Sequence, residues 1–181
     1  MRSDEDLALS LQQSDSSALP PLVERHHSAL IGFLYRLTGG DRQLAEDLAQ
    51  EAFLRVLRGI QQYHYPRPFK PWLYAIATNI ARDHYKSADA RHTLNMTEAD
   101  DLNLSAEEPE DAVVNTDEEQ HLIGALRTLP PHQRETVILR YYQELSLAEI
   151  AETLSIPIGT VKSRLSLGLR QLKAQLEKET P

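Results

Sequence analysis

The stretch "SLAEIAETLSIPIGTVKSRL", Ser146–Leu165, decides the fold. Apolar residues recur at helical spacing on both sides of "SIP", so the sequence predicts two helices, residues 147–154 and residues 158 to about 177. Ser155 stands in the turn between them, at the position that usually favours glycine in a left-handed conformation. Two helices joined by such a short turn are typical of a helix-turn-helix.

The second helix of a helix-turn-helix can enter the DNA major groove by its N-terminal end. A lysine and several hydroxyl groups are predicted to point outward there, where they can reach base edges or phosphates, and the free amides of a helix start suit a phosphate. The candidate DNA contacts are Gly159, Thr160, Lys162, Ser163 and Ser166. From the pattern alone, the alternative is an ordinary helical hairpin with a solvated basic face.

The composition excludes several kinds of protein. The chain has 181 residues and no cysteine, so it holds no disulfide or thiolate ligand, and no metal is expected. A glycine-rich phosphate loop and a catalytic set are both missing, which predicts a protein that is not an enzyme and needs no cofactor. No run of about 18 apolar residues is present, and the acidic N-terminus is unlike a signal peptide. We therefore expect a cytoplasmic protein without a membrane span.

The periodic segments fall into two groups separated by an acidic stretch. A net charge of −8 would by itself argue against nucleic-acid binding. Most of this charge lies in residues 91–116, which hold seven acids against one arginine, so the rest of the chain is close to neutral. This stretch lacks sustained periodicity and is predicted to be flexible. Helices are predicted over residues 17–37, 41–60, 72–86, 117–129, 131–144, 147–154 and 158–177. We expect an all-α fold with small helical domains at residues 1–87 and 117–181, joined by an acidic linker at residues 88–116.

The predicted helix 41–60 carries a polar face opposite its apolar stripe. Several of the polar side chains are spaced four residues apart, so they line up along the helix surface. These residues are Glu46, Asp47, Gln50, Glu51 and Arg55. By itself, the pattern favours a merely solvated face over a protein-binding one.

A second polar line follows the predicted helix 72–86 and the proline-rich loop before it. Asparagine and arginine suit base edges, lysine suits phosphates, and aromatic rings can stack an unpaired base. The candidates are Asn79, Arg82, Asp83 and Lys86 on the helix, and Tyr63, His64, Tyr65 and Arg67 in the loop. Trp72, at the start of the helix, is expected to be a core anchor more than a stacking platform.

Four blocks, in the right order, resemble the extracytoplasmic-function (ECF) class of bacterial sigma-70-type RNA polymerase sigma factors. They are "ALPPLVERHHSALIGFLYRLTGG", "DRQLAEDLAQEAFLRVLRGI", "FKPWLYAIATNIARDHYKS" and "LPPHQRETVILRYYQELSLAEIAETLSIPIGTVKSRL". The first three blocks resemble sigma region 2, and the last resembles sigma region 4 with its helix-turn-helix. Together they cover nearly the whole chain, from about Ser17 to Leu176.

The resemblance implies a transcription initiation factor that binds core RNA polymerase and directs it to promoter DNA. The polar face of helix 41–60 would dock on the β′ clamp helices, with the β flap as a further contact. The second polar line would read and help to melt the minus-10 element, and the helix-turn-helix residues would read the minus-35 element. An anti-sigma protein is an implied partner, and the acidic linker would thread the RNA-exit path of the polymerase.

Two other classes of protein remain open from the residues alone. A one- or two-component regulator would place its helix-turn-helix on an operator directly, but residues 1–90 show neither a βαβ pattern nor a phospho-acceptor pocket. A helical protein-interaction adaptor is the more distant alternative.

Overall fold

The computed structural model describes residues 1–95 and 116–179, and over these ranges it is built from helices, turns and loops. The α-helices are α1 (Asp4–Gln12), α2 (Leu19–Leu37), α3 (Arg42–Gly59), α4 (Phe69–Asn95), α5 (Asp117–Arg127), α6 (Pro131–Tyr141), α7 (Leu147–Leu154) and α8 (Ile158–Glu179). Two short 3-10 turns are η1 (Ser16–Ala18) and η2 (Ile60–Gln62). The expected all-α fold is confirmed, whereas most of the predicted linker lies outside the described residues.

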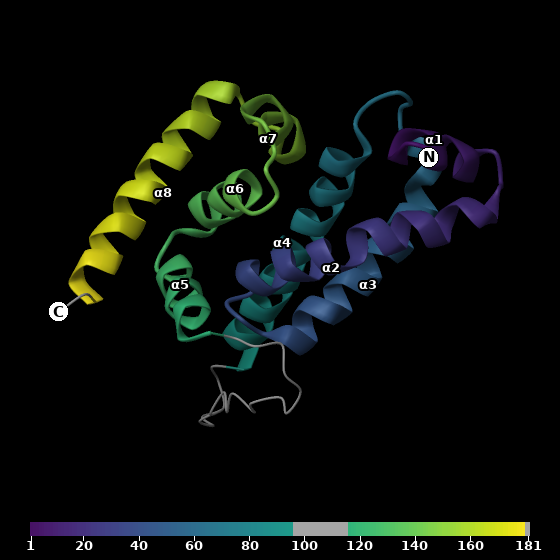
Figure 1. Cartoon of the computed structure of the whole chain (residues 1–181). Coiled ribbons are helices and arrows are strands. Elements are labelled where there is room, and N and C mark those ends of the chain that lie inside the picture. The colour runs from purple at the N-terminus through teal and green to yellow at the C-terminus, as the bar shows by residue number, and fades with distance from the viewer. Residues whose placement is uncertain (96–115, 180–181) are drawn as a thin grey trace.

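Helices α2, α3 and α4 pack together and form the core of the N-terminal half (Figure 1). Phe33 and Leu34 of α2 are fully buried in this core. Asp41 caps α3, because its carboxylate accepts a hydrogen bond from the Leu44 amide at 2.9 Å. The apolar stripe of α3 faces the core over most of its length, but Leu57 remains 38% exposed.

Three helices in this half differ from the sequence prediction. The acidic N-terminal segment, for which no helix was predicted, forms α1. Helix α2 begins at Leu19 rather than at residue 17, because Ser17 lies in η1. The Asp15 carboxylate caps η1 by accepting a hydrogen bond from the Ser17 amide at 3.1 Å. Helix α4 begins three residues early and continues to Asn95, so helix covers the first residues of the predicted linker.

In the C-terminal half, α8 packs along α6 and α7 (Figure 1). Helix α7 spans the predicted residues, and a capping box at Ser146 holds its start. Ser155 adopts the left-handed conformation, with φ of 53° and ψ of 48°, so the turn forms as expected with a serine in the position that favours glycine. Val161 and Leu165 of α8 are buried, which fixes the face that α8 turns outward.

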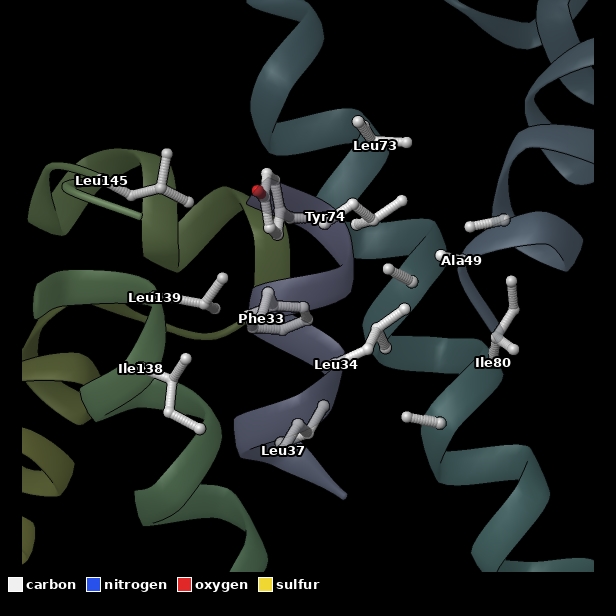
Figure 2. Packing of buried hydrophobic residues seen from close by; sticks show 14 of the residues in the cluster. Phe33, Leu34, Leu37, Ala49, Leu73, Tyr74, Ile80, Ile138, Leu139 and Leu145 are labelled. Carbon is white, nitrogen blue, oxygen red and sulfur yellow. The ribbon is translucent and has the colours of Figure 1, made fainter. Parts of the chain in front are cut away.

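The two halves pack against each other, whereas the sequence predicted only a tether between them. Helix α4 contacts α7, and α2 contacts α6. Figure 2 shows Phe33 and Tyr74 of the first half on the side toward Leu139 and Leu145 of the second. The buried Tyr74 hydroxyl donates a hydrogen bond to Gln143 Oε1 at 2.5 Å. The apolar cores of the two halves are therefore continuous in this arrangement.

Candidate nucleic-acid and polymerase surfaces

The N-terminal end of α8 presents the predicted helix-turn-helix residues to solvent. Gly159, Lys162, Ser163 and Ser166 are exposed, and Thr160 is half-buried. The Ser163 hydroxyl donates a hydrogen bond to the Gly159 carbonyl at 2.9 Å and keeps its capacity to accept one from a partner. A Cβ atom added at Gly159 would meet no atom within 4 Å, so the helix backbone there is open to close approach.

The structure divides the predicted polar face of α3 into two surfaces. Asp47 and Gln50 are exposed, and Glu46 is half-buried, on the side that faces α2. Glu51 and Arg55 pair with each other at 2.9 Å on the side toward α4, where the Arg55 guanidinium also reaches an α4 carboxylate at 3.6 Å. The five residues predicted as one polymerase-binding face therefore lie on two neighbouring sides of the helix.

A groove of about 1190 Å³ lies between α2 and α3 on the Asp47 side, and we call it the α2–α3 groove. Beside Asp47 and Gln50 it is lined by Leu54 and Leu57, which are 42% and 38% exposed. Tyr142 of the C-terminal half forms part of its wall. The two leucines were not predicted as surface residues. Their spacing of four and seven residues after Gln50 was the signal that could have found them, because it places them on the polar face.

A smaller groove of about 350 Å³ lies between the end of α3 and the start of α4. It brings together Arg55, Arg58, Trp72 and Asn79. Two guanidinium groups, an indole ring and an amide can serve the phosphate, the face and the edge of a nucleotide. Trp72 is half-buried and lies 5.3 Å from the Tyr63 ring, which fits a core anchor. Arg55, predicted to bind polymerase, thus shares a groove with Asn79, predicted to read the minus-10 element.

Arg82 does not project into solvent with the other candidates of α4. Asp83 and Lys86 are exposed, whereas Arg82 donates two hydrogen bonds to the Glu135 carboxylate of α6, with an Nε–Oε2 distance of 3.1 Å. Arg164 of α8 approaches the same carboxylate at 3.8 Å. Because the Glu135 side chain is only 4% exposed, Arg82 is held at the contact between the two halves.

The loop between η2 and α4, residues 63–68, brings three of its four predicted residues to the surface. His64, Tyr65 and Arg67 are exposed, whereas Tyr63 is buried. Burial, together with the charge on Glu5, raises the pKa of the Tyr63 hydroxyl to about 12. This hydroxyl donates a hydrogen bond to the Arg67 carbonyl. Tyr63 therefore shapes the loop from inside, and Tyr65 is the aromatic ring that is open to a base.

Among the described residues, no group of three or more metal-ligating side chains comes together. The helices of residues 1–95 and 116–179 include none that is long and apolar enough to cross a membrane.

Two family models match the chain in the order of its two halves. Residues 22–91 match the model described as Sigma-70 region 2, and residues 120–172 match the model described as Sigma-70, region 4. The ECF RNA polymerase sigma factor SigW of Bacillus subtilis is 34% identical over 174 residues, which cover 92% of each chain. The chain belongs to the ECF sigma factors. As a member of this family it directs transcription initiation by RNA polymerase and is not an enzyme.

Two solved structures of other proteins have the same fold as this ECF sigma factor. CnrH, solved in complex with the cytosolic domain of CnrY, has a TM-score of 0.73 at 24% identity and covers 98% of this chain and 99% of its own. The sigma factor RpoE, in a co-crystal with the anti-sigma factor NepR from Bartonella quintana, has a TM-score of 0.68 at 24% identity and covers 86% of this chain and 94% of its own. The family, fold and function predicted from the sequence are confirmed, and the individual site residues remain predictions.

Proposed function

We propose that this ECF sigma factor reads the minus-35 promoter element with the N-terminal end of α8. The observation that carries the proposal is the exposure of Lys162, Ser163 and Ser166 on a helix whose opposite side is buried. A lysine and two hydroxyls at this end of a helix can contact phosphates and base edges in the major groove. The start of a helix is also a favourable site for a phosphate, because of the helix dipole.

The minus-10 element is read, on this proposal, by the smaller groove and the loop beside it. Asn79 suits a base edge, Arg55 in the same groove suits a phosphate, and exposed Tyr65 can stack an unpaired base. His64, Arg67, Asp83 and Lys86 border this surface from the loop and from α4. The Arg82 guanidinium is bound to Glu135 and becomes free to bind DNA when the two halves separate. Melting is assisted because a base that leaves the duplex is held on the loop.

Core RNA polymerase binds at the α2–α3 groove, with the β′ clamp helices as the contact and the β flap meeting the C-terminal half. Leu54 and Leu57 give the groove an exposed apolar centre, and Asp47 and Gln50 give it a polar rim. An apolar centre with a polar rim is the usual composition of a protein–protein interface. Glu46 lies at the edge of the same surface.

We assign residues 1–87 to the region 2 domain and residues 117–181 to the region 4 domain, joined by the linker at residues 88–116. The matches to region 2 and region 4 support two domains in this order, although α4 and the region 2 match both extend past residue 87. Because the minus-10 and minus-35 elements lie apart along the duplex, the two halves separate when they bind a promoter. The protein acts in the cytoplasm, where polymerase and promoter DNA meet.

An anti-sigma protein is the proposed regulatory partner. RpoE, whose fold this chain shares, was solved in complex with the anti-sigma factor NepR, and CnrH with the cytosolic domain of CnrY. The exposed leucines of the α2–α3 groove leave an apolar surface that such a partner can cover in competition with polymerase.

Transcription in vitro with core RNA polymerase tests the minus-35 assignment. Lys162→Ala should lower initiation at promoters that the wild-type protein selects, because it removes a contact worth ~1–3 kcal/mol, and should leave core binding unchanged. Lys173→Ala, farther along the exposed side of α8, is the matched control and should behave as the wild type. Unchanged activity of Lys162→Ala across a panel of minus-35 mutants would remove this assignment.

A further inference from the structure

Helix α1 contacts both α2 and the loop at residues 63–68. Leu7, Ala8 and Leu11 of α1 are buried in the core of the N-terminal half. At its first turn, the Asp4 carboxylate binds Arg25 and His26 of α2, each at 2.7 Å. Helix α1 is therefore fixed to the body of the domain and can hold other segments in place.

The start of the loop is held by Gln12, the last residue of α1. The two hydrogens of the Gln12 amide group are used by two backbone carbonyls, because Nε2 lies 2.8 Å from the Ile60 oxygen and 2.6 Å from the Tyr63 oxygen. Gln61 returns the contact, since its Nε2 donates to the Gln12 carbonyl at 3.0 Å. One side chain of α1 thus sets the path of the chain as it leaves η2.

The end of the loop is held by Glu5. Its Oε1 atom accepts a hydrogen bond from the Phe69 amide at 3.1 Å, at the first residue of α4. A carboxylate at this place also matches the positive end of the helix dipole. The His26 ring, which is bound to Asp4, lies 5.6 Å from the Phe69 ring. Both ends of the loop are therefore attached to the same short helix.

Between these two attachments, the loop is shaped by its own hydrogen bonds. The Arg67 amide donates to the His64 carbonyl at 2.9 Å, and the buried Tyr63 hydroxyl donates to the Arg67 carbonyl. The positions of exposed His64, Tyr65 and Arg67 thus depend on where Tyr63 sits. The Gln12 amide binds the Tyr63 carbonyl directly, so it controls that position.

We propose that α1 is a brace for the loop that reads the minus-10 element, and that Gln12 is a positioning residue for promoter discrimination. The inference rests on the proposed role of the loop in minus-10 reading. Gln12 touches no DNA on this account, and it acts through the backbone of Tyr63. A purely structural role for α1 would instead give Gln12 an effect on stability alone.

The test compares Gln12→Met with Gln13→Met in the full-length protein bound to core RNA polymerase. Methionine keeps the length of Gln12 and removes its donors. Gln13 is an exposed neighbour whose side chain makes no hydrogen bond to the loop in the described structure. The readout is the ratio of initiation at a library-selected promoter to initiation at the same promoter with its minus-10 bases substituted. A loss of folded protein lowers both rates equally and leaves this ratio unchanged.

Gln12→Met should lower the ratio on the order of fivefold, as expected for two lost hydrogen bonds, and should leave core binding intact. Gln13→Met should keep the wild-type ratio. Glu5→Ala releases the other end of the loop and should also lower the ratio. This second variant provides the test if Gln12→Met does not fold. If either variant folds and keeps the wild-type ratio, the proposal that α1 positions the loop is wrong. If the wild-type protein itself ignores the minus-10 substitution, the proposed function of the loop fails instead.

Discussion

Glu135 is expected to hold the two halves of the free protein together. Its nearly buried carboxylate binds Arg82 of the N-terminal half and lies 3.8 Å from Arg164 of its own half. Glu135→Gln keeps the shape of the side chain and removes the charge. The substitution should shift the protein from docked halves toward separated halves.

The size of this effect follows from exposure. Breaking a buried ion pair costs about 3–5 kcal/mol when the remaining charge stays buried. Arg82 is 40% exposed, so its charge is already partly screened and regains water when α4 and α6 separate. We therefore expect docking to weaken by ~1–3 kcal/mol, which is a change of about 5- to 150-fold in the docking equilibrium.

The matched control is Glu152→Gln in the same interface. Glu152 lies 3.8 Å from Arg67, but the two side chains are 51% and 68% exposed, so their pairing contributes ~0–1 kcal/mol. Because the chain has no cysteine, spin labels can be placed cleanly at Glu24→Cys on α2 and Lys178→Cys on α8, and pulsed electron resonance gives the distance between them. Thermal unfolding confirms that each variant is folded.

Glu135→Gln should broaden and lengthen the distance distribution, and Glu152→Gln should leave it close to that of the wild type. An unchanged distribution for Glu135→Gln, or equal broadening in both variants, would refute the reasoning that the buried carboxylate controls docking.

Three further changes test other parts of the structure. Leu54→Asp places a charge in the α2–α3 groove and should weaken the pull-down of core RNA polymerase without lowering the thermal unfolding temperature, because Leu54 is already 42% exposed; full binding would contradict the assignment of this surface. Ser155→Gly should raise the free energy of unfolding by up to ~1 kcal/mol in a denaturant titration, because glycine adopts a φ of 53° without the steric cost, and a drop in stability would speak against strain at this turn. Burial by itself raises the pKa of the Asp4 carboxyl, but the hydrogen bonds from Arg25 and His26 outweigh it and hold this pKa below its ordinary value. Ionised Asp4 thus stabilises the fold above about pH 4, and this contribution is lost as the pH falls through the lower folded-state value. Asp4→Asn should therefore be less stable than the wild type at neutral pH, with a difference that shrinks in acid; a difference independent of pH would contradict this account.

Signals that act within one helix made much of the fold predictable. The period of apolar residues predicts α7 at its observed boundaries and α6 at its observed start. The exposed residues of α8 follow from the same period, because burial of Val161 and Leu165 turns Lys162 and Ser163 outward. Local periodicity carries this information because each helix presents one face to the core.

Contacts between distant segments could not be predicted in this way. Helix α1 has a weak apolar pattern and depends on partners that lie far away in the sequence, as the bonds from Gln12 to residues 60 and 63 show. The position of Arg82 was equally hidden, because its partner Glu135 is 53 residues away in the sequence. The sequence pattern of a polar residue on a helix surface is the same whether the residue faces solvent or contacts another domain.

Transcription with purified core RNA polymerase tests the central claim most directly. Core enzyme is incubated with a promoter library in the presence and in the absence of this protein, and the transcripts are sequenced to locate their start sites. We expect initiation at a defined set of promoters with shared minus-35 and minus-10 elements only when the protein is present, and no tight binding of the free protein to these promoters. Identical start sites with and without the protein, or binding to DNA that is independent of polymerase, would contradict it.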